Sequence, residues 1–164
     1  EALKTSKIVG MAALKYGDLS NQASKDYIFD MDRFVSFEGN TGPYILYTIV
    51  RIKSILAKAS DLEVQGVCTG DILPAVSGAE KDLMLQLSKY NEVIETSFME
   101  LAPHKICQYV YELANAFNRF YHDTKIIAEE NEKQRASWLS LISLAKDVLT
   151  ACIDLLGIEA PERM

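Results

Sequence analysis

The sequence predicts an all-α protein, a bundle of about five helices, from three observations. The chain of 164 residues holds 8 Gly and 4 Pro, which leaves few positions for the tight turns that connect short strands. Hydrophobic residues make up 49% and charged residues 24%, so the chain can bury a core and is neither disordered nor collagen-like. Apolar residues recur at helical spacing through long segments that begin or end near Pro or Gly. An all-β sandwich is thereby disfavoured.

The first 60 residues predict two long helices joined by a less regular segment. Residues 3–16 form the first helix, and we expect burial from several sides because apolar residues spread around it: Ile8, Met11, Ala12 and Leu14. Residues 26–37 fit either an extended segment or a short helix. Pro43 follows Asn, Thr and Gly, a pattern typical of a first helical turn, so a long helix is predicted from Pro43 to about Ala59.

The remaining residues predict three further helices after a long connection. Residues 60–78 are expected on the surface because four helix breakers interrupt them: Gly66, Gly70, Pro74 and Gly78. A helix is predicted from Ala79 to about Leu101, with a break near Asn91. Pro103 begins the next helix, which reaches about Lys125, and the last helix runs from Arg135 to Leu156.

The net charge of −6 is unevenly distributed along the chain. Residues 1–60 carry 8 Lys and Arg against 6 Asp and Glu, whereas residues 61–102 carry 2 against 8. An acidic protein is a poor non-specific nucleic-acid binder, because affinity for polyanions comes largely from neutralised phosphates. Any RNA binding is therefore expected to be local.

Several other classes of function find no support in the sequence. No apolar run reaches the ~18 uninterrupted residues of a membrane span, so we expect a soluble protein that has no membrane partner. Cys68, Cys107 and Cys152 are an odd set and are predicted to be reduced packing residues of a cytoplasmic protein. His104 and His122 lack metal-ligand spacing, and no phosphate-binding Gly-rich loop or nucleophile elbow occurs.

One face of the helix after Pro43 is the first candidate binding surface. At 100° per residue, two phenols and two cations fall on one side, away from the apolar stripe: Tyr44, Tyr47, Arg51 and Lys58. Aromatic rings beside cations are typical of single-stranded RNA recognition, because every base has a π-face on which a ring can stack. The spacing equally fits tyrosines that pack against a second helix with their hydroxyls at the rim.

The helix after Pro103 has an apolar face that includes Phe117, with Tyr121 at its margin. Phe117 is predicted to be buried in the core. The opposite face carries four polar residues, which we interpret as solvated although a contact surface is the alternative: Asn115, Asn118, Arg119 and His122.

Three stretches and the end of the chain together resemble a known family. They are Val9-Gly-Met-Ala-Ala-Leu-Lys-Tyr-Gly-Asp-Leu19, Asp26-Tyr-Ile-Phe-Asp-Met-Asp-Arg33, Ser36-Phe-Glu-Gly-Asn-Thr-Gly-Pro-Tyr-Ile-Leu-Tyr47 and the terminal Leu155-Leu-Gly-Ile-Glu-Ala-Pro-Glu-Arg-Met164. Over its full length the chain closely resembles the C-terminal portion of a bacterial arginyl-tRNA synthetase. The resemblance implies two parts: residues 1–36, the trailing end of the catalytic domain, and residues 37–164, a helical anticodon-binding domain of the DALR type.

The resemblance also implies what the chain binds. The expected partners are the anticodon loop of arginine tRNA and the catalytic domain of the same polypeptide. The His-Ile-Gly-His and Lys-Met-Ser-Lys signatures of class I active sites do not occur, so we expect no arginine activation by this segment alone. No cofactor is expected here, since ATP with Mg²⁺ would serve the parent enzyme.

By the same resemblance, Tyr44, Tyr47 and Arg51 meet the anticodon loop, and Phe117 with Tyr121 corresponds to an aromatic pair near that loop. Met164 comes close to the same place. Phe117 lacks the hydroxyl of its counterparts, and its predicted burial conflicts with this role. Two alternatives remain: the related domain of another class I synthetase such as the cysteinyl enzyme, and a helical protein-interaction domain.

Overall fold

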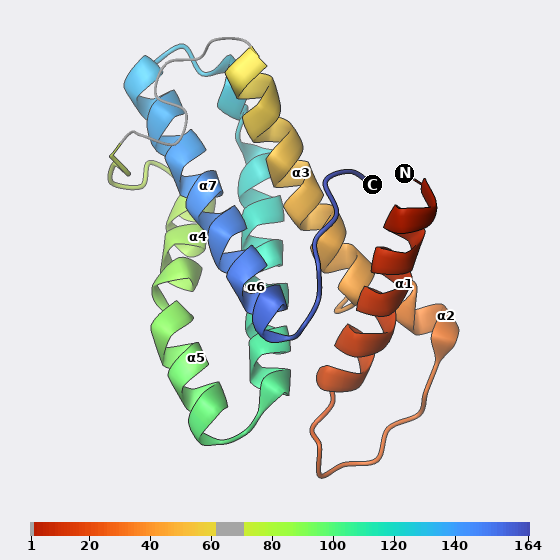
Figure 1. Cartoon of the computed structure of the whole chain (residues 1–164). Coiled ribbons are helices and arrows are strands. Elements are labelled where there is room, and N and C mark those ends of the chain that lie inside the picture. The colour runs from red at the N-terminus through yellow and green to blue at the C-terminus, as the bar shows by residue number, and fades with distance from the viewer. Residues whose placement is uncertain (1, 62–70) are drawn as a thin grey trace.

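The computed structural model describes residues 2–61 and 71–164, and within those ranges it is helical with no strand. This confirms the predicted all-α class, although the described part has seven α-helices and one short 3-10 helix rather than about five (Figure 1). The elements are α1 (Ala2–Leu19), α2 (Met31–Phe34), α3 (Gly42–Asp61), α4 (Gly78–Ser88), α5 (Tyr90–Met99), α6 (Pro103–Asp123), η1 (Ile126–Ala128) and α7 (Glu132–Leu155).

The core lies between α3, α4, α6 and α7, and α5 continues the line of α4 along α6 (Figure 1). The apolar stripe predicted on α3 consists of Ile45, Ile49, Ile52 and Leu56; the three isoleucines are almost completely buried, and Leu56 is partly buried against the same core. They belong to one apolar cluster with Leu113 of α6 and Leu149 of α7. Removing such a side chain costs about 2–5 kcal/mol of stability, because it loses both burial and packing.

The helix boundaries follow local signals in the sequence. Ser77 and Asn131 cap α4 and α7, each accepting a hydrogen bond from a backbone N–H in the first turn. Pro103 occupies the first turn of α6, as predicted. The break predicted near Asn91 is confirmed, since α4 ends and α5 begins on either side of Lys89.

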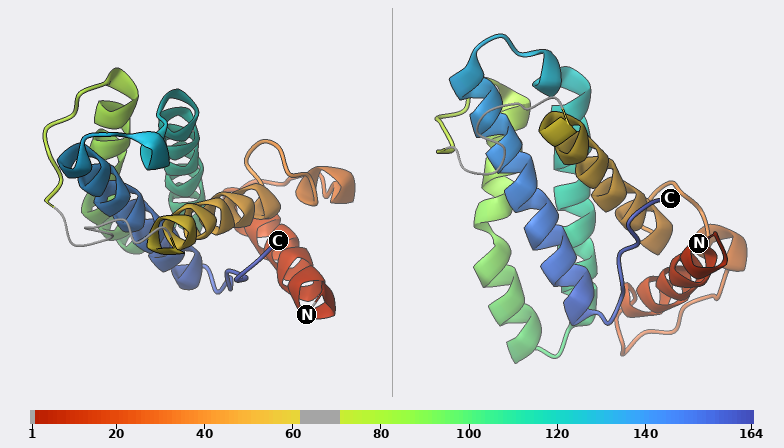
Figure 2. Two further views of the ribbon diagram at one scale, coloured as in Figure 1. Left: turned by 90° about the horizontal axis from the view of Figure 1, so that it is seen from above. Right: turned by 45° about the horizontal axis from the view of Figure 1, so that its top comes forward.

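Helix α1 lies at the edge of the bundle against α3, on the side away from α4 (Figure 2). The two helices approach closely because Gly42 has no side chain, and a Cβ there would overlap the carbonyl oxygen of Ala12. The expectation that α1 is buried from several sides is wrong. Only one face is covered, while Met11 and Leu14 remain 55% and 40% exposed.

Tyr16 fastens α1 to the rest of the fold. Its ring is fully buried, and its hydroxyl oxygen lies 2.7 Å from the carbonyl oxygen of Cys107 and 2.6 Å from Oδ1 of Asn40. The hydroxyl has one proton, so it donates to one of these oxygens, and the Asn40 amide can supply the other bond through its NH₂ group. Burial raises the pKa of Tyr16. Helix α1 thus shares a core with the bundle through Ala12 and Tyr16, and a boundary at residue 36 stays a prediction.

Helix α7 alone among the described helices is long and apolar enough by composition to cross a membrane. Of its most apolar stretch, 56% is buried inside the protein, where it packs on α3 and α6. That is the pattern of a core helix.

Two of the three cysteines lie in the described ranges, and both are free and buried. Burial raises the pKa of Cys107 and of Cys152 to about 12, so both stay protonated and pack as small apolar groups. The prediction of packing residues is confirmed for these two, and Cys68 lies outside the described residues.

Candidate nucleic-acid interface

The predicted aromatic residues and Arg51 meet where α3 packs on α6. Tyr44, Tyr47 and Arg51 come from α3, at intervals of three and four residues that place them on one side of the helix. Tyr121 comes from the last turns of α6. We call the surface formed by Tyr44, Tyr47, Arg51, Asn118 and Tyr121 the α3–α6 seam.

Arg51 lies between two exposed rings of the seam. The carbon of its guanidinium group lies 4.7 Å from the centroid of the Tyr47 ring and 5.8 Å from that of Tyr121. Both distances are typical of a cation held over aromatic faces. Tyr47 is 42% exposed and Tyr121 is 40% exposed, so part of each ring remains open to a ligand.

Asn118 joins the polar groups of the seam. Its Oδ1 accepts a hydrogen bond of 2.6 Å from Arg51, and its Nδ2 donates to the hydroxyl oxygens of Tyr44 at 2.9 Å and Thr48 at 3.2 Å. The Tyr44 hydroxyl in turn donates to Oδ1 of Asn115 at 2.6 Å. The interpretation of Asn118 as merely solvated is therefore wrong, because it is partly buried and binds side chains of α3. Asn115, Arg119 and His122 are exposed as interpreted, although Asn115 also accepts from Tyr44.

Tyr44 differs from the exposed phenol that the sequence suggested. Its ring is half-buried and packs edge-on against Tyr111, with centroids 5.8 Å apart. Burial raises the pKa of its hydroxyl, and the hydrogen bond from Asn118 opposes that shift. Tyr44 thus forms part of the wall beside Arg51, and here the packing alternative from the sequence is correct.

Phe117 requires a correction as well. The resemblance placed it beside the anticodon loop, but its ring is fully buried and cannot touch RNA. It stacks on Tyr121, with centroids 6.0 Å and planes 14° apart. The burial predicted from helical periodicity is confirmed, and Phe117 acts only by supporting the exposed ring.

Lys58 lies where two surface grooves meet. The first groove, of about 470 Å³, is formed by α3, the end of α6 and η1, and its rim includes Tyr121, His122 and Lys125. The second, of about 1020 Å³, runs between α3, α7 and the C-terminal tail and is lined by Lys146 and Met164, among others. Lys58 lines both grooves, so it links Tyr121 on one side with Met164 on the other.

The tail that places Met164 is fastened by lysines of α1 and α3. Lys53 donates to Oε1 of Glu162 at 2.7 Å and to the carbonyl oxygen of Pro161 at 3.2 Å. Lys15 donates to the carbonyl oxygen of Gly157. Ile158 is buried in the core, whereas Met164 is 41% exposed. The tail therefore returns along α3 (Figure 1), and Lys53 is a contributor that the sequence did not reveal.

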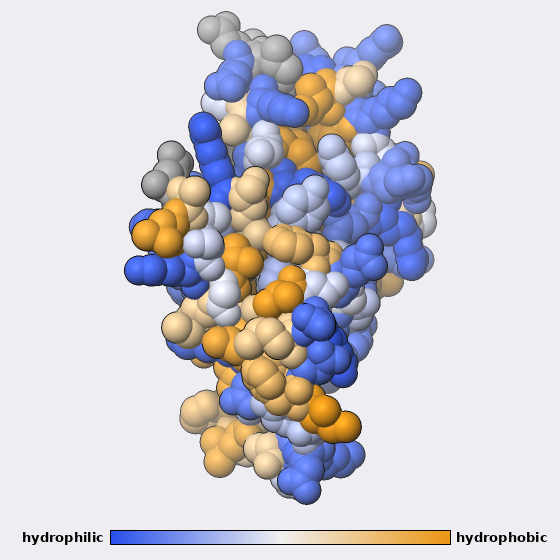
Figure 3. All heavy atoms as spheres, turned by 90° about the vertical axis from the view of Figure 1, so that its right-hand side faces the viewer, coloured by the Kyte–Doolittle hydropathy of each residue, from blue (hydrophilic) through white to orange (hydrophobic). Residues whose placement is uncertain are grey.

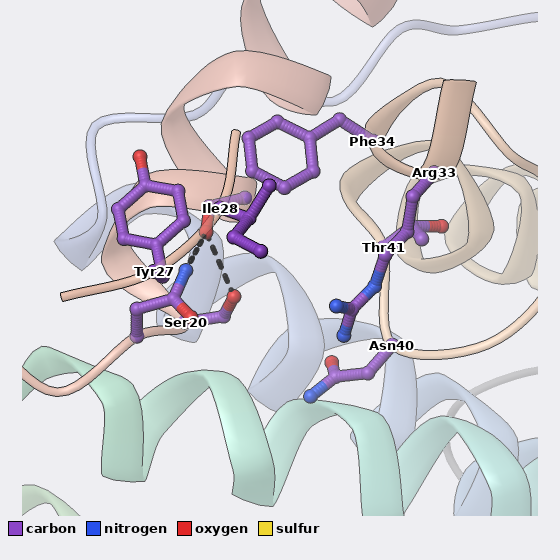
Figure 4. Close-up of a pocket in the computed structure, with 9 residues that line it drawn as sticks. Ser20, Tyr27, Ile28, Arg33, Phe34, Asn40 and Thr41 are labelled. Atoms are coloured by element: carbon purple, nitrogen blue, oxygen red, sulfur yellow. Dashed lines mark hydrogen bonds between the residues drawn. The ribbon is translucent and has the colours of Figure 1, made fainter. Parts of the chain in front are cut away.

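A separate pocket of about 250 Å³ lies between the end of α1 and α2 (Figure 4). Its lining includes Arg33, Asn40, Thr41 and Ser20. The Ser20 hydroxyl donates a hydrogen bond to the carbonyl oxygen of Gly17. It shares no residue with the α3–α6 seam. Within residues 2–61 and 71–164, no three His, Cys, Asp or Glu side chains gather at a metal-binding distance.

Comparison with known proteins identifies the family. Residues 45–164 match the DALR anticodon binding domain. The chain is 63% identical to the arginine–tRNA ligase of Agathobacter rectalis and 56% identical to that of Alkaliphilus oremlandii, covering all of this chain and 28% of each relative.

Solved structures agree with this match. The arginyl-tRNA synthetase of Thermus thermophilus superposes with a TM-score of 0.90 at 29% identity, over all of this chain and 28% of that one. The synthetase of Plasmodium falciparum gives 0.86 at 32% identity, over 98% of this chain and 28% of that one. The chain thus spans just over a quarter of the length of these relatives, and it belongs to the DALR anticodon-binding domain family in the form carried by arginyl-tRNA synthetases.

Proposed function

We propose that this chain binds the anticodon loop of arginine tRNA through the α3–α6 seam and the two grooves that meet at Lys58. The observation that carries the proposal is the guanidinium group of Arg51 held between the half-exposed rings of Tyr47 and Tyr121. Aromatic faces accept an unstacked base, and a fixed guanidinium group donates hydrogen bonds to the edge of that base. The family match supports the same partner.

The genetic code makes one pocket sufficient. All arginine codons, CGN and AGR, have guanine in the middle, so every arginine tRNA has cytosine as its middle anticodon base. Cytosine presents two neighbouring acceptors, O2 and N3, to a donor group, whereas uracil carries a proton on N3. Arg51 has only donors, and those not bound to Asn118 have no protein partner among the described residues. A donor directed at N3 therefore favours cytosine over uracil.

The surrounding charge suits the RNA backbone despite the acidic total. Three carboxylates line the two grooves, and two of them, Glu162 and Asp147, are paired with Lys53 and Lys146. The grooves hold five cations against these three acids: Lys53, Lys58, Lys125, Lys146 and Arg163. Such side chains neutralise phosphates and fix the loop without reading sequence. These groove cations support the prediction that the attraction for RNA is local, although the chain as a whole is acidic.

The rest of the reaction belongs to the longer protein in this proposal. That protein joins arginine to its tRNA in the cytoplasm, with ATP and Mg²⁺ bound by its catalytic domain. Helices α1 and α2 face that domain, because apolar side chains gather on their outer surface (Figure 3). Ile28 and Phe29, in the segment between the two helices, and Phe37, just after α2, are 88%, 55% and 53% exposed, as expected of a surface that another domain covers.

A titration across salt concentrations tests the proposal. An anticodon stem-loop of arginine tRNA is mixed with the chain in a gel-shift assay, alongside loops that carry each other base in the middle position. We expect binding that weakens as salt rises and that prefers cytosine. Equal binding of all four loops would contradict the cytosine pocket, and no binding of any loop would favour a protein-interaction domain.

A further inference from the structure

We propose that Asn118 is a positioning residue, which sets the direction of the Arg51 guanidinium group and thereby the choice between cytosine and uracil. The inference rests on the proposed function of the α3–α6 seam. It concerns a residue that does not itself contact the base, since Asn118 reaches RNA only through Arg51.

The hydrogen bonds of Asn118 leave it one orientation. Arginine has no acceptor, so the amide oxygen must face Arg51. The Tyr44 hydroxyl gives its single proton to Asn115 and must therefore accept from the NH₂ group of Asn118. The reversed amide would place its NH₂ group against a donor of Arg51. The hydrogen bonds on both sides of Asn118 therefore require the same orientation of its amide.

Asn118 is in turn anchored to the buried part of α3. Its NH₂ group also reaches Oγ1 of Thr48, a fully buried residue whose hydroxyl donates to the carbonyl oxygen of Tyr44. Because the Thr48 hydroxyl donates its only proton to the backbone, it can only accept a hydrogen bond from Asn118. The amide thus connects a rigid backbone position to a long, flexible side chain.

The hydrogen bond to Asn118 is needed because the rings of Tyr47 and Tyr121 alone do not fix the orientation of the guanidinium group. Stacking over Tyr47 and Tyr121 restrains how far the group lies from each ring, but it tolerates rotation within the plane. The bond from the terminal nitrogen of Arg51 to Asn118 sets that rotation. A guanidinium group fixed before RNA arrives loses less freedom on binding and keeps its remaining donors in one direction.

The alternative is that Asn118 merely bridges α3 and α6. A bridge would affect stability, whereas a positioning residue affects discrimination between bases. Two substitutions distinguish the bridging role from the positioning role. Asn118→Leu keeps the size of the side chain but removes every hydrogen bond, whereas Asn118→Asp keeps the acceptor for Arg51. Asn115→Leu is the matched control, because Asn115 lies one turn earlier on α6 and contacts Tyr44 but not Arg51.

The measurement is the ratio of the dissociation constants for loops with uracil and with cytosine in the middle position, taken well below the melting temperature of every variant. We expect Asn118→Leu to lower this ratio about tenfold, and Asn118→Asp and Asn115→Leu to keep it within about threefold of the unsubstituted chain. In a chain that already carries Arg51→Ala, Asn118→Leu should change the ratio by less than about twofold, because the two residues act as one unit.

Two results would overturn the proposal. If Asn118→Leu lowers the melting temperature but leaves the ratio unchanged, Asn118 is only a bridge between helices. If its effect multiplies with that of Arg51→Ala, Asn118 acts independently of the guanidinium group. In both cases the unsubstituted chain still prefers cytosine and the proposed function stands. If the unsubstituted chain shows no preference for cytosine, both the proposed cytosine pocket and the positioning role of Asn118 are refuted.

Discussion

The buried ring of Phe117 lies parallel to the half-exposed ring of Tyr121, one turn later on α6, with centroids 6.0 Å apart. One aromatic residue thus faces the core while its neighbour faces solvent. The arrangement makes the position of a surface ring depend on core packing. It also explains how Phe117, which cannot touch RNA, supports the α3–α6 seam.

Phe117→Ala is expected to destabilise the protein by about 3–5 kcal/mol, because a large cavity opens in the core and the support of Tyr121 is lost. Urea denaturation followed by circular dichroism measures the change. Phe117→Leu is the control and should cost far less, since it refills most of the volume. A loss below about 1 kcal/mol for the alanine variant would show that the ring is not a core residue.

Tyr47→Ala is expected to weaken binding of the anticodon stem-loop by about 1–3 kcal/mol, the contribution of one stacked base. Stability should change by less than about 0.5 kcal/mol, because Tyr47 is a surface residue. Fluorescence anisotropy of a labelled loop and thermal denaturation give the two quantities. Tyr47→Phe keeps the ring and should bind almost as well as tyrosine. Equal weakening by both substitutions would assign the effect to the hydroxyl and refute stacking.

Lys58→Ala is expected to weaken binding to all loops alike and to reduce the slope of log affinity against log salt by about 0.7–1, as expected for one lost phosphate contact. The preference for cytosine should be unchanged. Lys7, an exposed lysine of α1, provides the control, since Lys7→Ala should leave the slope as it was. If the slope falls equally for Lys58→Ala and Lys7→Ala, the RNA does not bind specifically at the grooves beside Lys58.

Acid is expected to release the end of the tail. The hydrogen bond from Lys53, and then its charge, hold the pKa of Glu162 below the ordinary value of 4.5. A lowered pKa in the folded state means that the contribution of this pair is present above pH 4.5 and is lost as the pH falls through the lower folded value. Met164 should then become mobile, while the buried Ile158 keeps the start of the tail in place.

The methyl resonance of Met164, assigned by comparison with Met164→Leu, reports this release. It should shift in the unsubstituted chain as the pH falls from 6 to well below 4.5, because the pKa of Glu162 lies below that ordinary value. In Glu162→Gln the shift should be clearly smaller, because only the terminal carboxyl of Met164 then gains a proton beside the methyl group. A shift of equal size in both proteins would show that Glu162 does not hold the end of the tail.

Much of the fold could be predicted because its signals are local. Pro43 and Pro103 mark helix starts, and the spacing of Ile45, Ile49 and Ile52 defines a buried face. The break between α4 and α5 could be placed only approximately, near Asn91, because neither Gly nor Pro marks Lys89.

The seam could be predicted only in part. Helical spacing placed Tyr47 and Arg51 on one face, but it does not say which helix lies opposite them. Asn118 was therefore interpreted as solvated, although it is the partner of Arg51. The route of the tail depends on contacts more than one hundred residues apart, such as that of Lys53 with Glu162, and no local pattern encodes it.

Crosslinking from the base itself tests whether the middle base of the anticodon lies beside Tyr47 and Tyr121. An anticodon stem-loop of arginine tRNA with 5-iodocytidine as its middle base is bound to the chain and irradiated, and the crosslinked peptides are identified by mass spectrometry after trypsin digestion. We predict crosslinks to Tyr47 in the peptide 34–51 or to Tyr121 in the peptide 120–125. Crosslinks confined to α4 or α5, with both of these peptides unmodified, would contradict it.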